Sequence, residues 1–115
     1  RTTMKVIKES HGDAVVLTLK GEFDSFVTGP FSDEVQKVFD DGCHRVVLNM
    51  RLVKFVNSTA LGAMIRARKS AQAQGGDLVV SQPSQAVREA MEALGLDKLF
   101  SFHDDDAAAV GGLGA

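Results

Sequence analysis

Two short apolar runs, Val46-Val47-Leu48 and Leu78-Val79-Val80, constrain the fold of this chain more than any other feature. A strand with one solvated face alternates apolar and polar residues, whereas a near-continuous apolar run is typical of a strand that is buried on both faces. Strands of that kind belong to sheets that helices cover on both sides. We therefore expect buried strands at residues 45–49 and 77–81.

The rest of the chain supplies the remaining elements. Residues 4–9 and 14–19 are predicted strands, which a turn at residues 11–13 joins into a hairpin. A short extended piece at residues 96–102 precedes a last short helix at residues 104–109. Three longer stretches carry apolar residues at helical spacing: residues 30–42, 58–75 and 84–95.

This order of elements, with short connections, favours a single α/β layer fold. We expect a mixed β-sheet of four to five strands packed with about four α-helices, the later strands being parallel. The domain is expected to span residues 1–110. Residues 111–115, Gly-Gly-Leu-Gly-Ala, have little to bury and are predicted to form a flexible C-terminal tail.

Composition narrows the classes of function. With 44% hydrophobic and 24% charged residues, the 115-residue chain is typical of a globular protein. Its net charge of -2 argues against a nucleic-acid binder, which would carry clustered positive charge. No apolar run approaches the roughly 18 residues of a membrane span, and no signal peptide precedes the first strand. We expect a cytoplasmic protein that does not insert into membranes.

The junction that follows the first of the two apolar runs is the place where chemistry is expected. Asn57, Ser58 and Thr59 stand where an amphipathic helix should begin, and their side-chain oxygens suit the free amides of a first helical turn. The same amides and the positive end of the helix dipole would also favour a phosphate. On these grounds Ser58 is either a plain cap or a phosphate acceptor.

Conventional catalysis is not supported. No Gly-x-Ser-x-Gly motif surrounds Ser58, and His11, His44 and His103 fall in a predicted turn, a strand entrance and a late loop. No His or Cys pair has the spacing of metal ligands, and Cys43 is the only cysteine. We therefore expect no metal, no cofactor and no enzymatic activity.

Three motifs resemble the STAS domain family, typified by bacterial anti-sigma factor antagonists. Residues 53–62, Val-Lys-Phe-Val-Asn-Ser-Thr-Ala-Leu-Gly, are similar to the family pattern of an apolar stretch followed by Asp-Ser-Ser/Thr-Gly-Leu-Gly. Residues 19–24, Leu-Lys-Gly-Glu-Phe-Asp, resemble its Gly-Glu-Leu-Asp, and residues 95–100, Gly-Leu-Asp-Lys-Leu-Phe, its Gly-Leu-x-x-Leu/Ile-Phe. The resemblance extends from about Lys5 to Val110.

The resemblance implies a switch without an active site of its own. In the family, a kinase-type anti-sigma factor binds the unphosphorylated antagonist and phosphorylates the first Ser of the motif, and a phosphatase reverses this. Ser58 falls on that acceptor, and Thr59 on a possible second one. The partner-binding residues that the resemblance implies are Asp24, Asn57, Ser58, Thr59, Ala60 and Leu61.

Three positions depart from the family pattern. Asn57 stands where the family usually has Asp, and Ala60 stands where it usually has Gly. Asn49 takes the place of an Asp that commonly ends the preceding strand. Asn caps a helix as well as Asp but lacks its charge, and the Ala60 methyl is expected to obstruct a partner that approaches the bare glycine. The alternative function is a STAS scaffold or subunit that is not phosphorylated, as in stressosomes or phospholipid transporters.

Overall fold

The computed structural model describes residues 4–113. Within this range the chain forms five strands, four α-helices and one 3-10 turn. In chain order the elements are β1 (Lys5–His11), β2 (Ala14–Phe23), α1 (Thr28–Asp40), β3 (Arg45–Val56), α2 (Ser58–Ala73), β4 (Asp77–Ser81), α3 (Gln85–Ala93), the 3-10 turn (Asp97–Leu99), β5 (Phe102–His103) and α4 (Asp106–Gly112).

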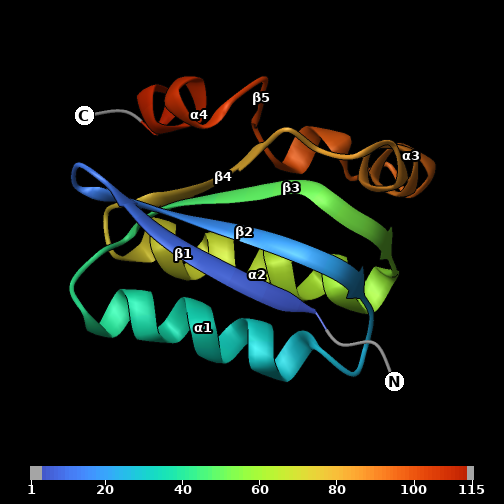
Figure 1. The fold of residues 1–115 in the computed structure, drawn as a ribbon, viewed down its shortest axis with the longest axis horizontal. Helices are drawn as coiled ribbons and strands as arrows, with labels where there is room; N and C mark the ends of the chain where they lie inside the picture. Colours follow the sequence, from blue (N-terminus) through green and yellow to red (C-terminus); the bar gives the residue numbers. More distant parts are fainter. Residues whose placement is uncertain (1–3, 114–115) are drawn as a thin grey trace.

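The sheet has the strand order β1-β2-β3-β4-β5. β1 and β2 pair antiparallel across a two-residue turn, and the later pairs are all parallel. Helices α1 and α2 cover one face of this sheet, and α4 lies on the opposite side (Figure 1). The buried residues of α3, Val87 and Met91, belong to the same large core as those of α1 and α2. The expected mixed α/β sheet is therefore confirmed. Within residues 4–113 no helix is both long enough and apolar enough to cross a membrane.

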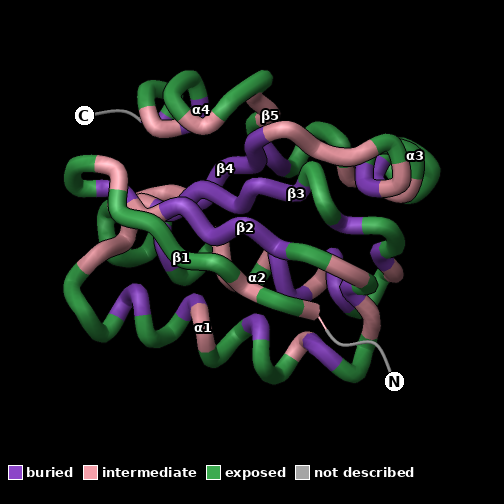
Figure 2. Tube along the Cα trace, in the orientation of Figure 1, coloured by how far each residue is buried: buried purple, intermediate pink, exposed green. Residues whose placement is uncertain are grey.

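The two apolar runs are buried on both faces, as their composition predicts. In β3, Val46 and Leu48 belong to the large core that includes α1 and α2, whereas Val47 belongs to a second, smaller cluster under α4. Figure 2 shows β2, β3 and β4 as the most continuously buried part of the trace. The members of the smaller cluster are Ala14, Val16, Val47, Val79, Ala109 and Leu113.

β3 is longer than predicted. The expected strand ended at residue 49, but β3 continues to Val56 and stays paired with β2 while running beyond the end of β4. Two register shifts in the β2–β3 pairing break the two-residue alternation, so the buried positions Met50, Val53 and Val56 fall three apart. The start of α3 lies along this extension, where the Ser84 amide donates to the Met50 carbonyl at 3.3 Å and its hydroxyl donates to the Val53 carbonyl at 2.7 Å.

The C-terminal region also differs from the prediction. Three residues of the expected extended piece at 96–102 form the 3-10 turn, and only Phe102 and His103 form a strand. The last helix, α4, begins at Asp106 and continues through Gly112, and Leu113 is only 9% exposed. Residues 111–113 of the expected tail therefore pack on the domain, because Leu113 contributes to the smaller cluster. Residues 114 and 115 lie outside the described residues.

Candidate functional site

The candidate site lies where β3 ends and α2 begins, at the carboxyl edge of the parallel strands, as predicted. Asn57 has extended backbone angles, φ -108° and ψ 176°, and forms the N-cap of α2. Its Oδ1 accepts a hydrogen bond from the Ala60 amide at 2.9 Å. Its own amide donates to the Phe23 carbonyl at the end of β2, at 3.3 Å. Asn57 therefore joins α2 to the edge of the sheet.

Ser58 and Thr59 are the first two residues of α2, and both are exposed. Because Asn57 performs the capping, the Ser58 hydroxyl is not used as a cap. The Ser58 and Thr59 amides make no hydrogen bond within the part of the chain that the structure describes. The first turn of α2 also carries no acidic residue. An anion on Ser58 would thus meet free amide donors and the positive end of a 16-residue helix.

The loop between β2 and α1 approaches the same point. The Asn57 side-chain amide donates to the Ser25 hydroxyl at 3.2 Å. One residue earlier, Asp24 is half-buried, and its Oδ1 accepts from the Phe26 amide at 2.9 Å. The fold therefore brings together four of the expected site residues: Asp24, Asn57, Ser58 and Thr59.

Ala60 and Leu61 do not take part in this surface. Both are fully buried in the large core and face away from solvent. The expectation that the Ala60 methyl obstructs a partner is therefore wrong, since that methyl packs inside the protein. A family motif gives the order of residues along α2, whereas the face that each residue presents follows from the rotation of about 100° per residue.

Asn49, the third departure, does not lie at the site either. It is fully buried in β3, seven residues before the end of that strand. Its side-chain amide donates to the Asp106 carboxylate of α4 at 2.9 Å. The residue therefore connects the sheet to α4, on the side opposite to α2 (Figure 1).

Two exposed phenylalanines flank the site and were not among the expected residues. Phe26 is 77% exposed in the β2–α1 loop, and Phe55 is 47% exposed two residues before Asn57. Large aromatic side chains in exposed positions are common anchors of protein–protein interfaces. The sequence holds no local signal for the exposure of Phe26, because its apolar neighbour Val27 in the same loop is buried in the core.

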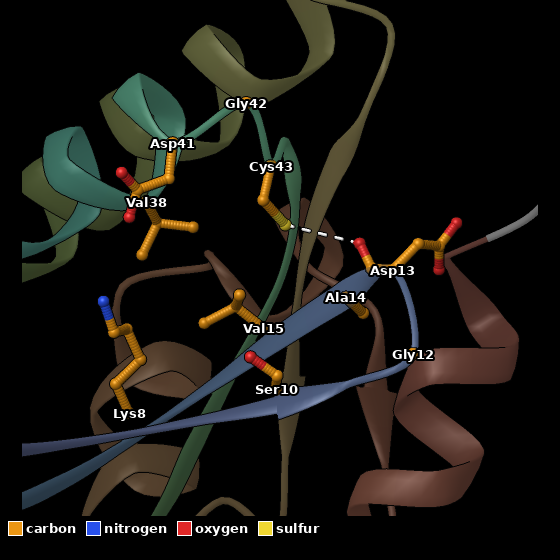
Figure 3. Close-up of a pocket in the computed structure, with 10 residues that line it drawn as sticks. All are labelled: Lys8, Ser10, Gly12, Asp13, Ala14, Val15, Val38, Asp41, Gly42 and Cys43. Atoms are coloured by element: carbon orange, nitrogen blue, oxygen red, sulfur yellow. Dashed lines mark hydrogen bonds between the residues drawn. The ribbon is translucent and has the colours of Figure 1, made fainter.

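A pocket of about 310 Å³ lies at the other end of the sheet, between the β1–β2 turn and the end of α1 (Figure 3). Lys8, Asp41 and Cys43 are among its lining residues, and the Cys43 thiol donates to the Asp13 carbonyl at 3.4 Å. The pocket adjoins the amino end of β2, whereas Ser58 follows the carboxyl end of β3. In residues 4–113 no group of three or more His, Cys, Asp or Glu side chains could hold a metal ion.

The fold agrees with the comparisons with known proteins. The model of the STAS domain matches residues 5–109, so the chain belongs to the STAS domain family. The anti-sigma F factor antagonist of Paenibacillus polymyxa is 24% identical over 112 residues, covering 93% of this chain and 92% of that protein.

Solved structures show the same fold. An anti-sigma factor antagonist from Mycobacterium paratuberculosis superposes with a TM-score of 0.84 at 20% identity, covering 96% of this chain and 94% of that one. The anti-sigma factor antagonist SpoIIAA in its unphosphorylated form gives a TM-score of 0.77 at 20% identity, covering 96% of this chain and all of that one. These similarities establish that the chain has the same fold as these structures.

Proposed function

We propose that this protein is an anti-sigma factor antagonist that binds a kinase-type anti-sigma factor and is switched by phosphorylation of Ser58. The observation that carries the proposal is the exposed Ser58 hydroxyl at the first position of α2, left free because Asn57 caps the helix. The curated relative and the structural neighbours bear the name of this class. SpoIIAA is known in a phosphorylated form as well, with a TM-score of 0.72 to this chain.

The geometry supports a switch that acts on binding and leaves the fold intact. A phosphoserine adds about -1.5 to -2 charges at pH 7. At Ser58 this charge is accommodated by the unpaired amides of α2, so the helix is not disrupted. A partner docked over Ser58, Phe26 and Phe55 would instead have to desolvate that anion. Phosphorylation should therefore release the partner, and a phosphatase should restore binding.

In this proposal the chain supplies a surface, and the partner supplies the catalysis. The exposed Phe26 and Phe55 act as apolar anchors for the partner. Asp24 positions Phe26 through the hydrogen bond that its carboxylate accepts from the Phe26 amide. Thr59 shares the exposure of Ser58 and is the candidate for a second phosphate. Ala60 and Leu61 support the helix from within the core.

The test is phosphorylation by a kinase-type anti-sigma factor of the same organism, with ATP. The chain and its Thr59→Ala variant should each gain one phosphate on Ser58, and Ser58→Ala should gain none while still binding the kinase. Mass spectrometry locates the phosphate, and calorimetry measures binding. A phosphate found only on Thr59 or elsewhere and not on Ser58, or equal kinase affinity before and after modification, would disprove the switch.

A scaffold role without phosphorylation is the second candidate, and Asn57 is the observation that favours it. The family Asp is replaced by an amide whose Nδ2 is used to hold Ser25, so the site lacks the negative charge of the family pattern. A scaffold would bind its partner through the same exposed surface. Stable complex formation that ATP and the kinase leave unchanged would favour this role over the switch.

A further inference from the structure

β1 leaves one long edge of the sheet open. It is the first strand in the order, and no strand of residues 4–113 pairs with its outer edge. Five of its seven residues are exposed, and Ile7 is 48% exposed (Figure 2). An edge of this length offers unpaired backbone donors and acceptors to another strand.

The hairpin fixes which backbone groups point outward. The turn has two residues, with Gly12 at φ +65°, and closes on the pair His11–Ala14. A hairpin of this kind closes on a hydrogen-bonded pair, and bonding toward the neighbouring strand then alternates along the strand. The odd-numbered residues of β1 therefore bond toward β2. The amides and carbonyls of Val6, Lys8 and Ser10 face the open edge.

A second copy of the same strand fits this edge in one register. We propose that two copies pair antiparallel through β1, with the two-fold axis at Ile7. Val6 then lies opposite Lys8 of the second copy, and both present their backbone groups to one another. Ile7 packs against Ile7 of the second copy in a pair without hydrogen bonds, where side chains approach closely.

Charge supports this register. Opposite Lys5 stands Glu9 of the second copy, and the two-fold axis repeats the pair, so the interface holds two attractive pairs. Glu9 is accessible for this contact, since its side chain is 65% exposed even with its Oε2 3.6 Å from the His11 Nε2. A register centred on Lys8 would instead place Lys8 against Lys8 of the second copy, and like charges opposite each other are destabilising.

Pairing would join two five-stranded sheets into one and leave both candidate sites accessible. Ser58 follows the carboxyl end of β3, which lies at the same end of the sheet as the start of β1. Because β1 runs antiparallel to its copy, the two Ser58 residues lie at opposite ends of the joined sheet. The dimer is thus independent of the proposed switch, and Ser58→Asp should leave it unchanged.

Charge reversal tests the register in solution. Sedimentation equilibrium should show a monomer–dimer equilibrium for the chain. Lys5→Glu and Glu9→Lys should each weaken dimerisation at least about fivefold, because two attractive pairs become repulsive. The double variant should restore it. Lys69→Glu, the same charge change on the exposed part of α2, is the matched control and should have no effect. A monomer at every concentration, or single variants that dimerise like the parent, would refute the proposal.

Crosslinking gives an independent readout of the register. In a Cys43→Ser background, Ile7→Cys places two thiols on the two-fold axis in a close pair, and oxidised glutathione should convert the protein to a covalent dimer. Lys5→Cys lies opposite residue 9 of the second copy and should stay largely uncrosslinked. Equal crosslinking of the two variants, or none in either, would overturn the register centred on Ile7. Circular dichroism establishes that each variant is folded.

Discussion

The side chain of Asn57 makes two hydrogen bonds, which determine whether the Asp of the family pattern would also fit at this position. Its Oδ1 accepts from the Ala60 amide and its Nδ2 donates to the Ser25 hydroxyl. An Asp could still accept from Ala60, and the Ser25 hydroxyl could reverse its role and donate to the carboxylate. The backbone arrangement therefore tolerates either residue, and the difference lies in the charge next to Ser58.

Asn57→Asp should accordingly affect modification more than stability. We expect a free energy of unfolding within about 1 kcal/mol of the parent, because a carboxylate at a helix N-terminus is usually mildly stabilising. The new charge changes the electrostatic energy of an incoming phosphate by roughly 1 to 3 kcal/mol at 5 Å, so the rate of Ser58 phosphorylation should change at least about fivefold. Urea unfolding and kinase rates measure the two effects. Asn57→Ala, which removes both side-chain bonds, should instead lose about 1 kcal/mol of stability.

At the scale of elements, a polar row crosses the sheet under α4. Thr18, Asn49, Ser81 and His103 stand opposite one another on β2, β3, β4 and β5. Asn49 extends this row to α4 through its bond to Asp106. An Asp at position 49, as the family pattern has, would turn a carboxylate toward Asp106. The presence of Asn at position 49 is therefore explained by the Asp106 carboxylate of α4, which accepts a hydrogen bond from its side-chain amide.

Asn49→Asp should destabilise the protein by about 3 kcal/mol at pH 7, because two carboxylates would share a buried contact. Protonation of one of them allows it to donate to the other. The penalty should therefore be full well above the unfolded carboxyl pKa of about 3.9 and shrink as the pH falls toward it. Thermal unfolding at pH 8 and pH 5 measures this difference. The double variant Asn49→Asp/Asp106→Asn, which swaps donor and acceptor, should recover most of the loss. Failure of that rescue would show that the pair does not govern the effect.

For the whole molecule, the C-terminal helix completes a second core on the far side of the sheet from α1 and α2. Leu113 and Ala109 cover Val16, Val47 and Val79 in this cluster. Without them, the apolar residues on this face of three strands would be exposed. The end of the described chain is therefore a structural part of the domain.

Leu113→Ala should lower the free energy of unfolding by about 2 kcal/mol, near the lower end for a buried leucine because it lies close to the end of the chain. Leu99→Ala offers a matched control, since Leu99 is 44% exposed and should lose well under 1 kcal/mol. Chemical denaturation compares the two variants. Equal losses would show that α4 is not tightly packed.

Much of this architecture could be predicted from the sequence, because local and tertiary preferences agree there. The runs at Val46 and Leu78 indicate doubly buried strands, and Ser84 and Gly95 bound α3 where capping chemistry predicts. The extension of β3 could not be predicted, since register shifts remove its alternation. The burial of Leu113 was missed because Gly111 and Gly112 do not indicate a helix by their propensity.

The position of the site could be predicted from the sequence, but the set of residues that form its surface could be predicted only in part. Ser58 and Thr59 follow a strand and precede a periodic helix, so their place at the sheet edge follows from the order of elements. The inward direction of Ala60 and Leu61 depends on the rotation of α2 against the core. The exposure of Phe26 depends on how the β2–α1 loop leaves the sheet, which no local pattern specifies.

The overhang of β3 beyond β4 has a consequence for aggregation. An unpaired strand edge rich in apolar residues recruits other chains while a protein folds. Until α3 docks, the carbonyls of Met50 and Val53 on this edge lack their partner, Ser84. When α3 docks, Ser84 donates hydrogen bonds to these two carbonyls and closes this edge. The charged strand β1 then remains as the long edge of the sheet that is open to a neighbour. The proposed pairing through β1 ends in a closed dimer, whereas an open apolar edge at β3 would allow chains to add without limit.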